Sequence, residues 1–460
     1  MTTESGAGYD IDEMIQQDVN HLWHHLMQHK VFETSEPTII VEGRGMIVKD
    51  IRGREYLDAV SGGVWSVVVG YGRESIAACV AEQLVRMPYY AGIAGNIPTI
   101  QLARKLVDLL PHLNRAYFSN SGSEANEKAF KLIRQSAHLT GTGKYKILYR
   151  DRDYHGTTFA ALSATGQQER RVDYEPLVDG FVEFPHACCY RCAFGKEYPG
   201  CDIDCARVVE EIIQREGPET VGGIIVEPVT AGGGIIPPVP EYYPILQDIC
   251  KRYGVLMIMD EVVCGFGRTG KMFGFEHYDV EPDMVTLAKG LASSYMPISA
   301  TVVSEEVFNV FVNDPGDRMS FFRDISTFGG CAAGSAAALE TIRIIEDENL
   351  VENSRIRGDY LFERLQELRD FAVVGDIRGK GLFAGIEIVE DRKTKTPADE
   401  RLFGELIAAI REKGVLVGRT NRSIPGLNNT INLAPALIVT KDEIDRIVSA
   451  IRHALEKVSR

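Results

Sequence analysis

The sequence predicts an α/β protein with a large, doubly wound, mostly parallel sheet domain and a smaller α+β domain built from both chain ends. Two observations predict the large domain. The middle of the 460-residue chain alternates short apolar runs with amphipathic stretches, as a sheet with helices on both faces requires. Several of these runs are apolar throughout, which is typical of strands covered on both faces. A third observation, the loss of this pattern toward both ends, predicts the second domain.

The elements of the large domain follow in chain order. Strands are expected at 115–120, 146–151, 222–228, 255–261, 284–290 and 298–304. Helices are expected at 74–87, 205–217 and 242–254. The last two end on Gly217 and Gly254, and glycine is the usual residue just past a helix end.

The chain ends have a different pattern. Residues 42–60 alternate in polarity around Asp50 and Gly53, which predicts a hairpin. After about residue 340 a long helical segment leads to the run IRGKGLFAGIEIV and then to helix, strand and helix again. The expected division is 1–74 and 336–460 for the two parts of the small domain and 75–335 for the large one.

Composition limits the class of partner. A net charge of −15 argues against nucleic acid and anionic membrane as partners, because phosphate groups attract basic surfaces. The first residues, MTTESGAGYDIDEM, have neither the basic nor the apolar part of a signal peptide, and no stretch approaches the length that spans a bilayer. A cytoplasmic protein is therefore expected.

Five of the nine cysteines fall in one window, CCYRCAFGKEYPGCDIDC. Counted from Cys189, the spacing C-x2-C-x8-C-x3-C could supply four thiolates to zinc. A reduced, cysteine-rich surface loop is the alternative and the favoured interpretation, so no metal site is predicted.

Asp260 and Lys289 each end an apolar run, in GVLMIMDEV and MVTLAKG. In a parallel sheet both would lie at the carboxyl edge of the strands, where ligands bind. A buried acid and a buried lysine in one cleft fit pyridoxal 5′-phosphate, which needs a lysine to bind its aldehyde and a carboxylate to keep its ring nitrogen protonated. A buried ion pair without a cofactor is the alternative.

The segment FSNSGSEANEKAFKLIR (118–134) runs from a strand through a Gly/Ser turn into a helix. Ser121 and Glu124 match the capping pattern S-x-x-E, and the free amides of such a first turn can bind an anion. A phosphate is expected against Gly122 and Ser123, although an ordinary capped helix would have the same pattern.

Two further groups of residues follow strands. Tyr154 and His155, in DRDYHGTTF, come after the second expected strand, where an aromatic ring could stack on a planar heterocycle or simply fill the core. Glu227 ends GGIIVEP and would point into the same cleft as Asp260.

These motifs together resemble class III pyridoxal-phosphate aminotransferases, of fold type I. SGSEANE, YHG, IIVEP, MDEVVCGFGRTG and TLAKGL occur in the family's order and approximate spacing, and the similarity covers nearly the whole chain. The resemblance implies that Lys289 binds the cofactor aldehyde and shuttles a proton, and that Asp260 pairs with the ring nitrogen. It also implies that Val262 packs behind the ring, that Gly122 and Ser123 hold the phosphate, and that Tyr154 stacks on the ring.

The resemblance further implies an obligate homodimer with composite sites. Thr327, in ISTFGG, matches the threonine that the neighbouring subunit contributes to the phosphate. Two positions depart from the usual pattern: Ser294 stands where the family often has glycine, and GGCAAG replaces a more usual sequence containing proline. Both could alter the pocket wall, but neither removes a catalytic group.

The substrate is less constrained by the sequence. The segments HLWHHLMQH and SGGVWSVVVGYG resemble the pocket-forming part of ω-aminotransferases, which implies that Trp65 lines the substrate channel; core packing is the alternative. Arginine suits a carboxylate or sulfonate, and Arg419, Arg378 and, less strongly, Arg422 are the candidates.

The overall pattern is most similar to aminotransferases that use taurine as donor and pyruvate as acceptor. Alternative donors are β-alanine, 4-aminobutyrate, hypotaurine or a hydrophobic monoamine. A decarboxylase or aminomutase on the same fold is a more distant alternative. A non-catalytic protein on this fold is disfavoured, because it would have no reason to retain Asp260, Lys289 and Thr327 together.

Overall fold

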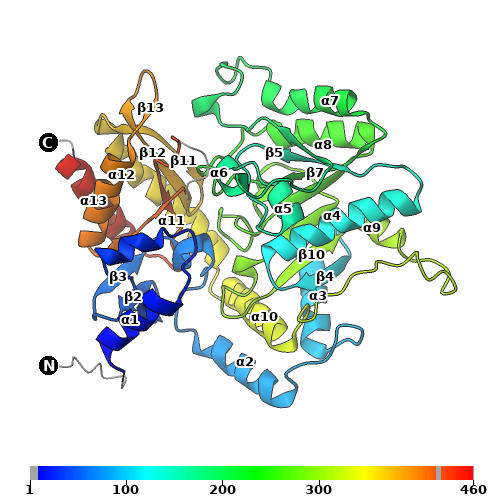
Figure 1. Cartoon of the computed structure of the whole chain (residues 1–460), viewed down its shortest axis with the longest axis horizontal. Helices are drawn as coiled ribbons and strands as arrows, with labels where there is room; N and C mark the ends of the chain where they lie inside the picture. The colour runs from blue at the N-terminus through cyan, green and yellow to red at the C-terminus, as the bar shows by residue number, and fades with distance from the viewer. Residues whose placement is uncertain (1–8, 421–425, 459–460) are drawn as a thin grey trace.

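The computed structural model describes residues 9–420 and 426–458, and its ribbon is shown in Figure 1. The helices are α1 (Ile11–His21), α2 (Glu74–Arg86), α3 (Ile97–Leu109), α4 (Gly122–Leu139), α5 (Phe159–Ser163), α6 (Gln168–Arg171), α7 (Asp204–Glu216), α8 (Tyr242–Tyr253), α9 (Glu305–Asn309), α10 (Ala332–Asp347), α11 (Leu350–Gln366), α12 (Glu400–Glu412) and α13 (Lys441–Val458). The strands are β1 (Ile40–Arg44), β2 (Ile47–Asp50), β3 (Glu55–Asp58), β4 (Arg115–Ser119), β5 (Lys146–Arg150), β6 (Phe181–Phe184), β7 (Val221–Val226), β8 (Leu256–Asp260), β9 (Met284–Leu287), β10 (Ser299–Val303), β11 (Val374–Lys380), β12 (Phe383–Asp391), β13 (Thr396–Pro397), β14 (Val415–Leu416), β15 (Gly418–Arg419) and β16 (Thr430–Leu433).

A seven-stranded sheet forms the centre of the large domain, in the order β4-β10-β9-β8-β7-β5-β6. The pairs β5–β6, β5–β7, β7–β8 and β8–β9 are parallel, and β10 runs antiparallel to both β9 and β4. Because β4 therefore runs in the same direction as β9, all strands except β10 end at one edge. The predicted mostly parallel sheet is confirmed, with the six expected strands in place. The four-residue strand β6 is the one that the sequence pattern did not predict.

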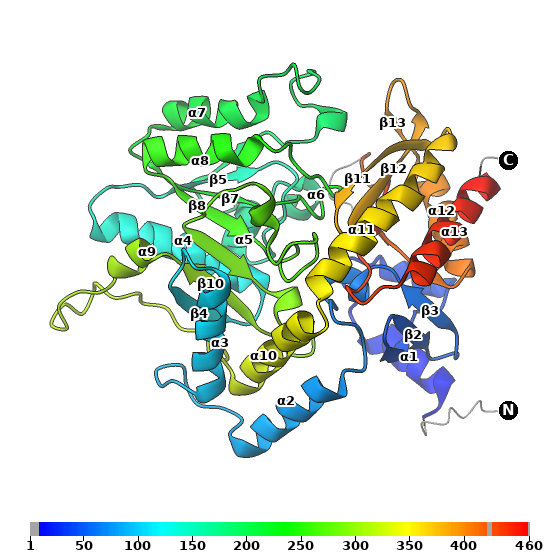
Figure 2. The ribbon, with the colours of Figure 1, turned by 180° about the vertical axis from the view of Figure 1, so that it is seen from behind.

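Helices cover both faces of this sheet. Side chains alternate along each strand, so Ile147 and Ile258 join the cluster that contains α4, whereas Leu148, Met257 and Met259 join the cluster that contains α7 and α8. Figures 1 and 2 show α4 lying along the sheet and α7 and α8 packed beside each other. The structure confirms the doubly wound arrangement.

Both chain ends build the smaller α+β part. The strand β14 pairs in parallel with β3 and completes a sheet in the order β1-β2-β3-β14. A second sheet has the order β11-β12-β16-β15, with β13 paired to β12. In Figures 1 and 2 the blue N-terminal strands lie beside the orange and red C-terminal helices. The exact boundaries after 74 and 335 stay a prediction.

Two local features differ from the simplest interpretation of the sequence. The expected hairpin has the predicted turn, with Gly53 at φ 81° and its amide donating to the Asp50 carbonyl at 2.9 Å, but a third strand, β1, extends it. The long helical segment is two helices, α10 and α11, separated at Asn349, which has φ 51°. A left-handed residue ends a helix because it turns the next carbonyls off the helix axis, and asparagine tolerates this conformation.

Membrane insertion through a helix has no support in the described residues. None of the helices there combines the length and the hydropathy that crossing a bilayer requires.

Candidate active site

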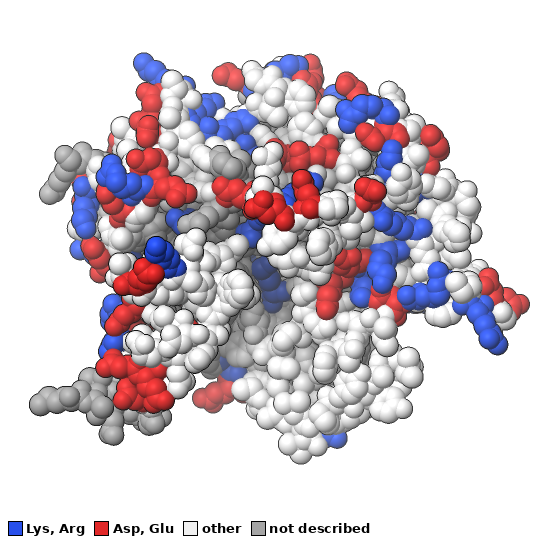
Figure 3. Space-filling view, in the orientation of Figure 1, with Lys and Arg blue, Asp and Glu red and all other residues white. Residues whose placement is uncertain are grey.

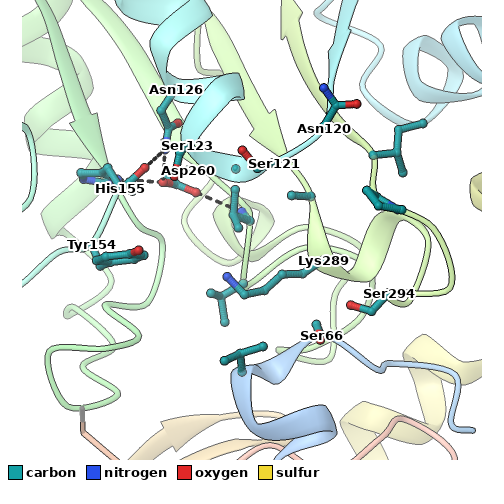
Figure 4. A pocket seen from close by; sticks show the side chains of 18 of the residues that line it. Ser66, Asn120, Ser121, Ser123, Asn126, Tyr154, His155, Asp260, Lys289 and Ser294 are labelled. Atoms are coloured by element: carbon teal, nitrogen blue, oxygen red, sulfur yellow. Dashed lines mark hydrogen bonds and ion pairs between the residues drawn. The ribbon is translucent and has the colours of Figure 1, made fainter. Parts of the chain in front are cut away.

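The residues predicted at strand ends meet at the carboxyl edge of the sheet. Asp260 is the last residue of β8, Lys289 follows β9, Glu227 follows β7 and Tyr154 follows β5. A cavity of about 370 Å³ opens there, and all four side chains line it together with Gly122, Ser123, His155 and Val262. Figure 4 shows Asp260, His155 and Tyr154 around one space, with the Lys289 side chain extending into it. The parallel sheet thus brings together residues that are up to 167 positions apart, as the sequence predicted.

Three donors hold the Asp260 carboxylate. The Asn126 side chain donates to Oδ2 at 2.8 Å, His155 Nδ1 lies 2.7 Å from the same oxygen, and the Val262 amide donates to Oδ1 at 3.1 Å. Figure 4 shows these bonds as dashed lines. These three bonds fix the orientation of the carboxylate at the cavity wall.

Lys289 is the buried amine of the cavity. Burial lowers its pKa below the ordinary 10.5, and this effect outweighs the nearby charges of Asp260 and Glu227, which act in the opposite direction. A lysine whose pKa is lowered is neutral more often at working pH, and a neutral amine is the nucleophilic form. Its backbone has φ 37°, an unusual conformation for a residue with a side chain, and such strain is often found at functional sites.

The N-terminus of α4 faces the same cavity. Ser121 caps the helix through a bond from the Glu124 amide to its Oγ at 3.3 Å, and the Glu124 carboxylate accepts the Asn120 amide at 2.6 Å. The predicted cap is present, although the return bond goes to Asn120 rather than to Ser121. The amides of Gly122 and Ser123, ahead of the capped Glu124 amide, have no acceptor one turn earlier in the helix, so they are available to an anion.

Two glycines let backbone segments approach closely around this helix end. A Cβ on Gly122 would lie 2.9 Å from Val262 Cγ2, and a Cβ on Gly156 would lie 2.4 Å from Ser123 Oγ. Val262 therefore packs directly against the start of α4, which fixes the distance between the helix end and the carboxyl end of β8.

Glu227 supports Tyr154. One carboxylate oxygen of Glu227 accepts the Tyr154 amide at 2.9 Å and the other accepts the Ala231 amide at 3.1 Å. Burial raises the pKa of Glu227 well above its usual range, and the charges of Asp153 and Asp260 add to this shift. Glu227 thus lines the cavity, and it positions the backbone that carries the aromatic ring.

Trp65 does not line this cavity. It is 8% exposed, its ring packs edge-to-face on Phe383 with centroids 5.8 Å apart, and it belongs to an apolar cluster. Its neighbours Val64 and Ser66 line the cavity instead. The sequence left two roles open for Trp65, the wall of the substrate channel and core packing. Core packing describes the indole better, because a distorted turn at 61–65 directs Trp65 inward.

The candidate arginines lie in different surroundings. Arg378 is neutralised: its Nη1 contacts Asp376 at 3.0 Å and Glu387 at 2.6 Å, and its Nε donates to the Gly234 carbonyl. It does not line the cavity, which contradicts the expectation that it is free to bind a substrate anion. Arg419 lines a second cavity, described below. Arg422 lies outside the described residues.

Thr327 is exposed and does not line the cavity of its own chain. This placement is compatible with a contribution to another subunit, which stays a prediction. Ser294 does line the cavity and has φ 60°, which explains why glycine suits this position. Cys331, in the other departure from the family pattern, precedes the first residue of α10.

The cysteine window forms a small pocket away from the active-site cavity. Cys188, Cys189, Cys192, Cys201 and Cys205 line it, and all are free thiols. Across the described residues, no group of three or more His, Cys, Asp or Glu side chains is arranged to hold a metal ion.

Sequence reasoning missed several residues of the cavity. Asn126 bonds both Asp260 and the His155 carbonyl, at 2.8 and 2.7 Å. A signal for Asn126 was present, since it lies four positions after Gly122 and hence on the same face of α4. Ser66 and Met296 also line the cavity, and they come from irregular segments with no motif to mark them.

Comparison with known proteins agrees with this geometry. The family model Aminotransferase class-III matches residues 30–455. The hypotaurine/taurine–pyruvate aminotransferase of Paracoccus denitrificans is 53% identical over 451 residues, which cover 98% of each chain. The taurine–pyruvate aminotransferase of Bilophila wadsworthia is 53% identical over 454 residues, covering 98% of this chain and 99% of the relative.

Solved structures show the same relationship. A Bacillus anthracis aminotransferase superimposes with a TM-score of 0.93 at 40% identity, covering 97% of this chain and 98% of the other. The ω-transaminase of Pseudomonas jessenii in complex with PMP has a TM-score of 0.91 at 32% identity, with 97% and 98% covered. With the fold, the lysine and aspartate at one sheet edge and the full-length similarity in agreement, this chain is an enzyme that belongs to the class III aminotransferases.

Proposed function

We propose that the enzyme uses pyridoxal 5′-phosphate to transfer the amino group of taurine to pyruvate, giving sulfoacetaldehyde and alanine. One observation carries the cofactor assignment. Lys289 is buried with a lowered pKa, and it faces the same cavity as Asp260, whose carboxylate has three hydrogen-bond partners. The donor and acceptor come from the relatives named above, which are similar over nearly their whole length.

The residues of the cavity fit this cofactor by their chemistry. The amides at the start of α4, with Gly122 and Ser123, suit a phosphate, and Asp260 suits a protonated ring nitrogen. Tyr154 offers a ring to stack on, and Val262 packs at the junction of the helix end and the β8 terminus. When bound, the cofactor would supply an electron sink for the deprotonated donor carbon and would carry the amino group between the two halves of the reaction.

The chain's own groups then have separate tasks. Lys289 Nζ would hold the cofactor through its aldehyde and, as a neutral amine, would move a proton to and from the donor carbon that bears nitrogen. Asp260 would pair with the ring nitrogen and keep it protonated, and His155 and Asn126 hold the carboxylate in place for this task. Glu227 holds the backbone of Tyr154.

Borohydride reduction of the cofactor-loaded enzyme, followed by peptide mapping, tests the covalent assignment. The label is expected on the peptide that contains Lys289, and Lys289→Ala should lose both the label and turnover. Label on another peptide, or substantial transamination by the variant, would contradict the role of Lys289.

An amine panel tests the substrate assignment. Taurine, β-alanine, 4-aminobutyrate, hypotaurine and a hydrophobic monoamine are each assayed with pyruvate and with 2-oxoglutarate. Taurine with pyruvate is expected to give the highest kcat/KM. Inactivity of taurine beside an active β-alanine control would remove taurine as the donor. Product formation without any oxo acid would favour a decarboxylase or aminomutase.

We also infer that the enzyme is a cytoplasmic homodimer in which each active site contains residues of both subunits. Large apolar side chains are exposed between α2 and α3 and in the segment that carries Thr327, among them Tyr90, Ile93, Ile325 and Phe328. The lower lobe in Figure 3, where α2 and α3 lie, is mostly white in this view, with few charged side chains. Apolar surface of this extent favours burial against a second chain, and Tyr89 already packs on Phe328, so the two segments form one surface.

A further inference from the structure

A second cavity, of about 900 Å³, contains two arginines that the catalytic assignment leaves unused. Arg170 and Arg419 line it, together with apolar and aromatic side chains that include Trp23, Phe159 and Tyr174. Figure 3 shows the face hollowed between the two halves of the molecule, with blue side chains deep in the hollow. Glu169 and Glu400 line this cavity as well, so a small anion is favoured there next to a guanidinium that no carboxylate pairs with.

Arg170 links this cavity to the active site. Its guanidinium lies 4.6 Å from the centroid of the Tyr154 ring, and Tyr154 lines the active-site cavity. The charge of Arg170 also acts on the pKa of Lys289, lowering it. Electrostatic influence declines with distance, so this effect puts Arg170 within electrostatic range of the reacting amine.

Arg170 forms no ion pair with an acidic side chain among the described residues, although the charge of the adjacent Glu169 acts on its pKa. Its Nε donates to Gln167 Oε1 at 2.7 Å, while neither Nη atom has an ion pair or hydrogen bond there. Arg378 is different, because two carboxylates already neutralise it. Two free Nη groups on a planar guanidinium suit bidentate contact with a sulfonate or a carboxylate.

Arg170 is also held in place before any ligand binds. The Gln167 side chain is buried and its Nε2 donates to the Arg152 carbonyl at 2.9 Å, so the acceptor that fixes Arg170 is itself anchored. Stacking on Tyr154 restrains the guanidinium plane. An oriented cation loses little freedom on binding an anion, which raises affinity and specificity.

We propose that Arg170 binds the anionic group of the amino donor, and thereby selects short donors whose sulfonate or carboxylate lies two carbons from the amine. This inference rests on the proposed function and names the residue that recognises the donor. A two-carbon donor is short, so an anion-binding group must lie near Lys289, and the stacked, unpaired Arg170 meets that need. Arg419, in strand β15, is then available to bind the carboxylate of the acceptor.

The test compares Arg170→Met with a matched control, Arg171→Met. Arg171 is the next residue of α6, but its guanidinium is directed to Glu183, at 3.8 Å, and to Tyr149. The half-reaction with taurine, β-alanine and propylamine is followed by cofactor absorbance in each variant. In Arg170→Met, the kcat/KM of the half-reaction is expected to fall by about 10- to 100-fold for taurine and β-alanine and by less than about 3-fold for propylamine. The difference is expected because a charge-assisted contact is lost only for anionic donors. Arg171→Met should match the wild type on all three.

Equal losses on propylamine and taurine, or no loss on either anionic donor, would overturn the proposal. Binding of ethanesulfonate, which cannot react, is measured by calorimetry on the same holoenzymes. Wild type and Arg171→Met should bind it, and Arg170→Met should not. Ethanesulfonate binding that survives in Arg170→Met but is lost in Arg419→Met would assign the anion to Arg419 instead.

Failure of the proposed function is distinguishable from failure of this inference. If wild type rejects taurine but accepts β-alanine, the donor assignment fails while the comparison of β-alanine with propylamine still tests Arg170. If wild type turns over none of these amines, the calorimetric arm still decides whether Arg170 binds a sulfonate. Arg170→Lys, which keeps a charge but not the planar fork, is expected to restore part of the binding.

Discussion

Asp260 contributes its charge rather than its shape to the proposed chemistry. Asp260→Asn keeps the size of the side chain but removes the charge that keeps the ring nitrogen protonated. We expect kcat to fall by at least about 100-fold, while the covalent bond to Lys289 still forms and is visible by absorbance.

The control for this prediction is Asp283→Asn, near the opposite end of β8, where a carboxylate accepts the Met257 amide at 2.7 Å. This variant should lose stability without a comparable loss of kcat. A fully active Asp260→Asn variant would contradict the assigned role.

Lys289 predicts a pH dependence of stability in the enzyme without cofactor. Burial lowers its pKa below 10.5, so the unfolded chain binds more protons than the folded one between the two values. The folded state is therefore penalised increasingly as the pH falls from about 10.5 toward the lowered pKa. Lys289→Met removes the penalty. Thermal melts from pH 6 to 10 should show the variant more stable than wild type at low pH, with the difference shrinking as the pH rises. A constant difference would contradict the pKa shift.

At the scale of single residues, the sequence predicted the catalytic pair but not its supports. Asp260, Lys289 and Tyr154 end or follow apolar runs, and a parallel sheet leaves them one edge to share. The sequence could not show whether Trp65 and Arg378 are available to a substrate. Their surroundings, Phe383 and the pair Asp376 and Glu387, come from distant parts of the chain, and only tertiary packing shows that both side chains are already occupied.

At the scale of elements, helix ends give the clearest prediction. Gly254 follows α8 with φ 59°, a conformation that costs a residue with a Cβ roughly 1–2 kcal/mol. Gly254→Ala should destabilise the protein by about 1 kcal/mol in denaturant unfolding. Gly404, inside α12, is a matched control: a Cβ there meets nothing within 4 Å. Gly404→Ala should stabilise by up to about 1 kcal/mol, because alanine is the better helix former. The same sign for both variants would contradict this account.

The same contrast shows what the sequence could predict about elements. Gly217 and Gly254 were expected to end helices, and both have positive φ. The break between α10 and α11 was harder to see because the residue there is Asn349, and asparagine in a polar, helical-looking stretch is an ambiguous signal. Strand β6 has only four residues, with Glu183 among them, too few to show a pattern.

At the scale of the whole molecule, the exposed apolar surface predicts the oligomer. Ile93 and Ile325 are 89% and 78% exposed, and a charge at either position would be buried in the proposed dimer. Ile93→Glu and Ile325→Glu should give monomers by light scattering and lose cofactor affinity, since Thr327 could no longer reach a neighbouring site.

Ile356→Glu is the control, because this residue is 44% exposed on α11, away from that surface. It should remain dimeric and active. A wild-type enzyme that is monomeric and fully active would contradict the composite site.

The fold as a whole was the most predictable level, because the alternation of apolar runs and helices allows few arrangements, and right-handed crossovers reduce them further. The order of strands and the antiparallel β10 could not be derived from single runs, since parallel and antiparallel central strands are equally apolar. The second cavity was also unpredictable: α6, the N-terminal segment and β15 meet there from three separate parts of the chain.

The pairing of β3 with β14 has a consequence for synthesis. Leu57 emerges from the ribosome about 360 residues before its partner Val415. At about 5–20 residues per second, the nascent edge of β3 waits roughly 20 to 70 s for the strand that covers it. During that interval it is an open template for wrong pairing, so a chaperone that shields nascent chains should raise the yield of this enzyme.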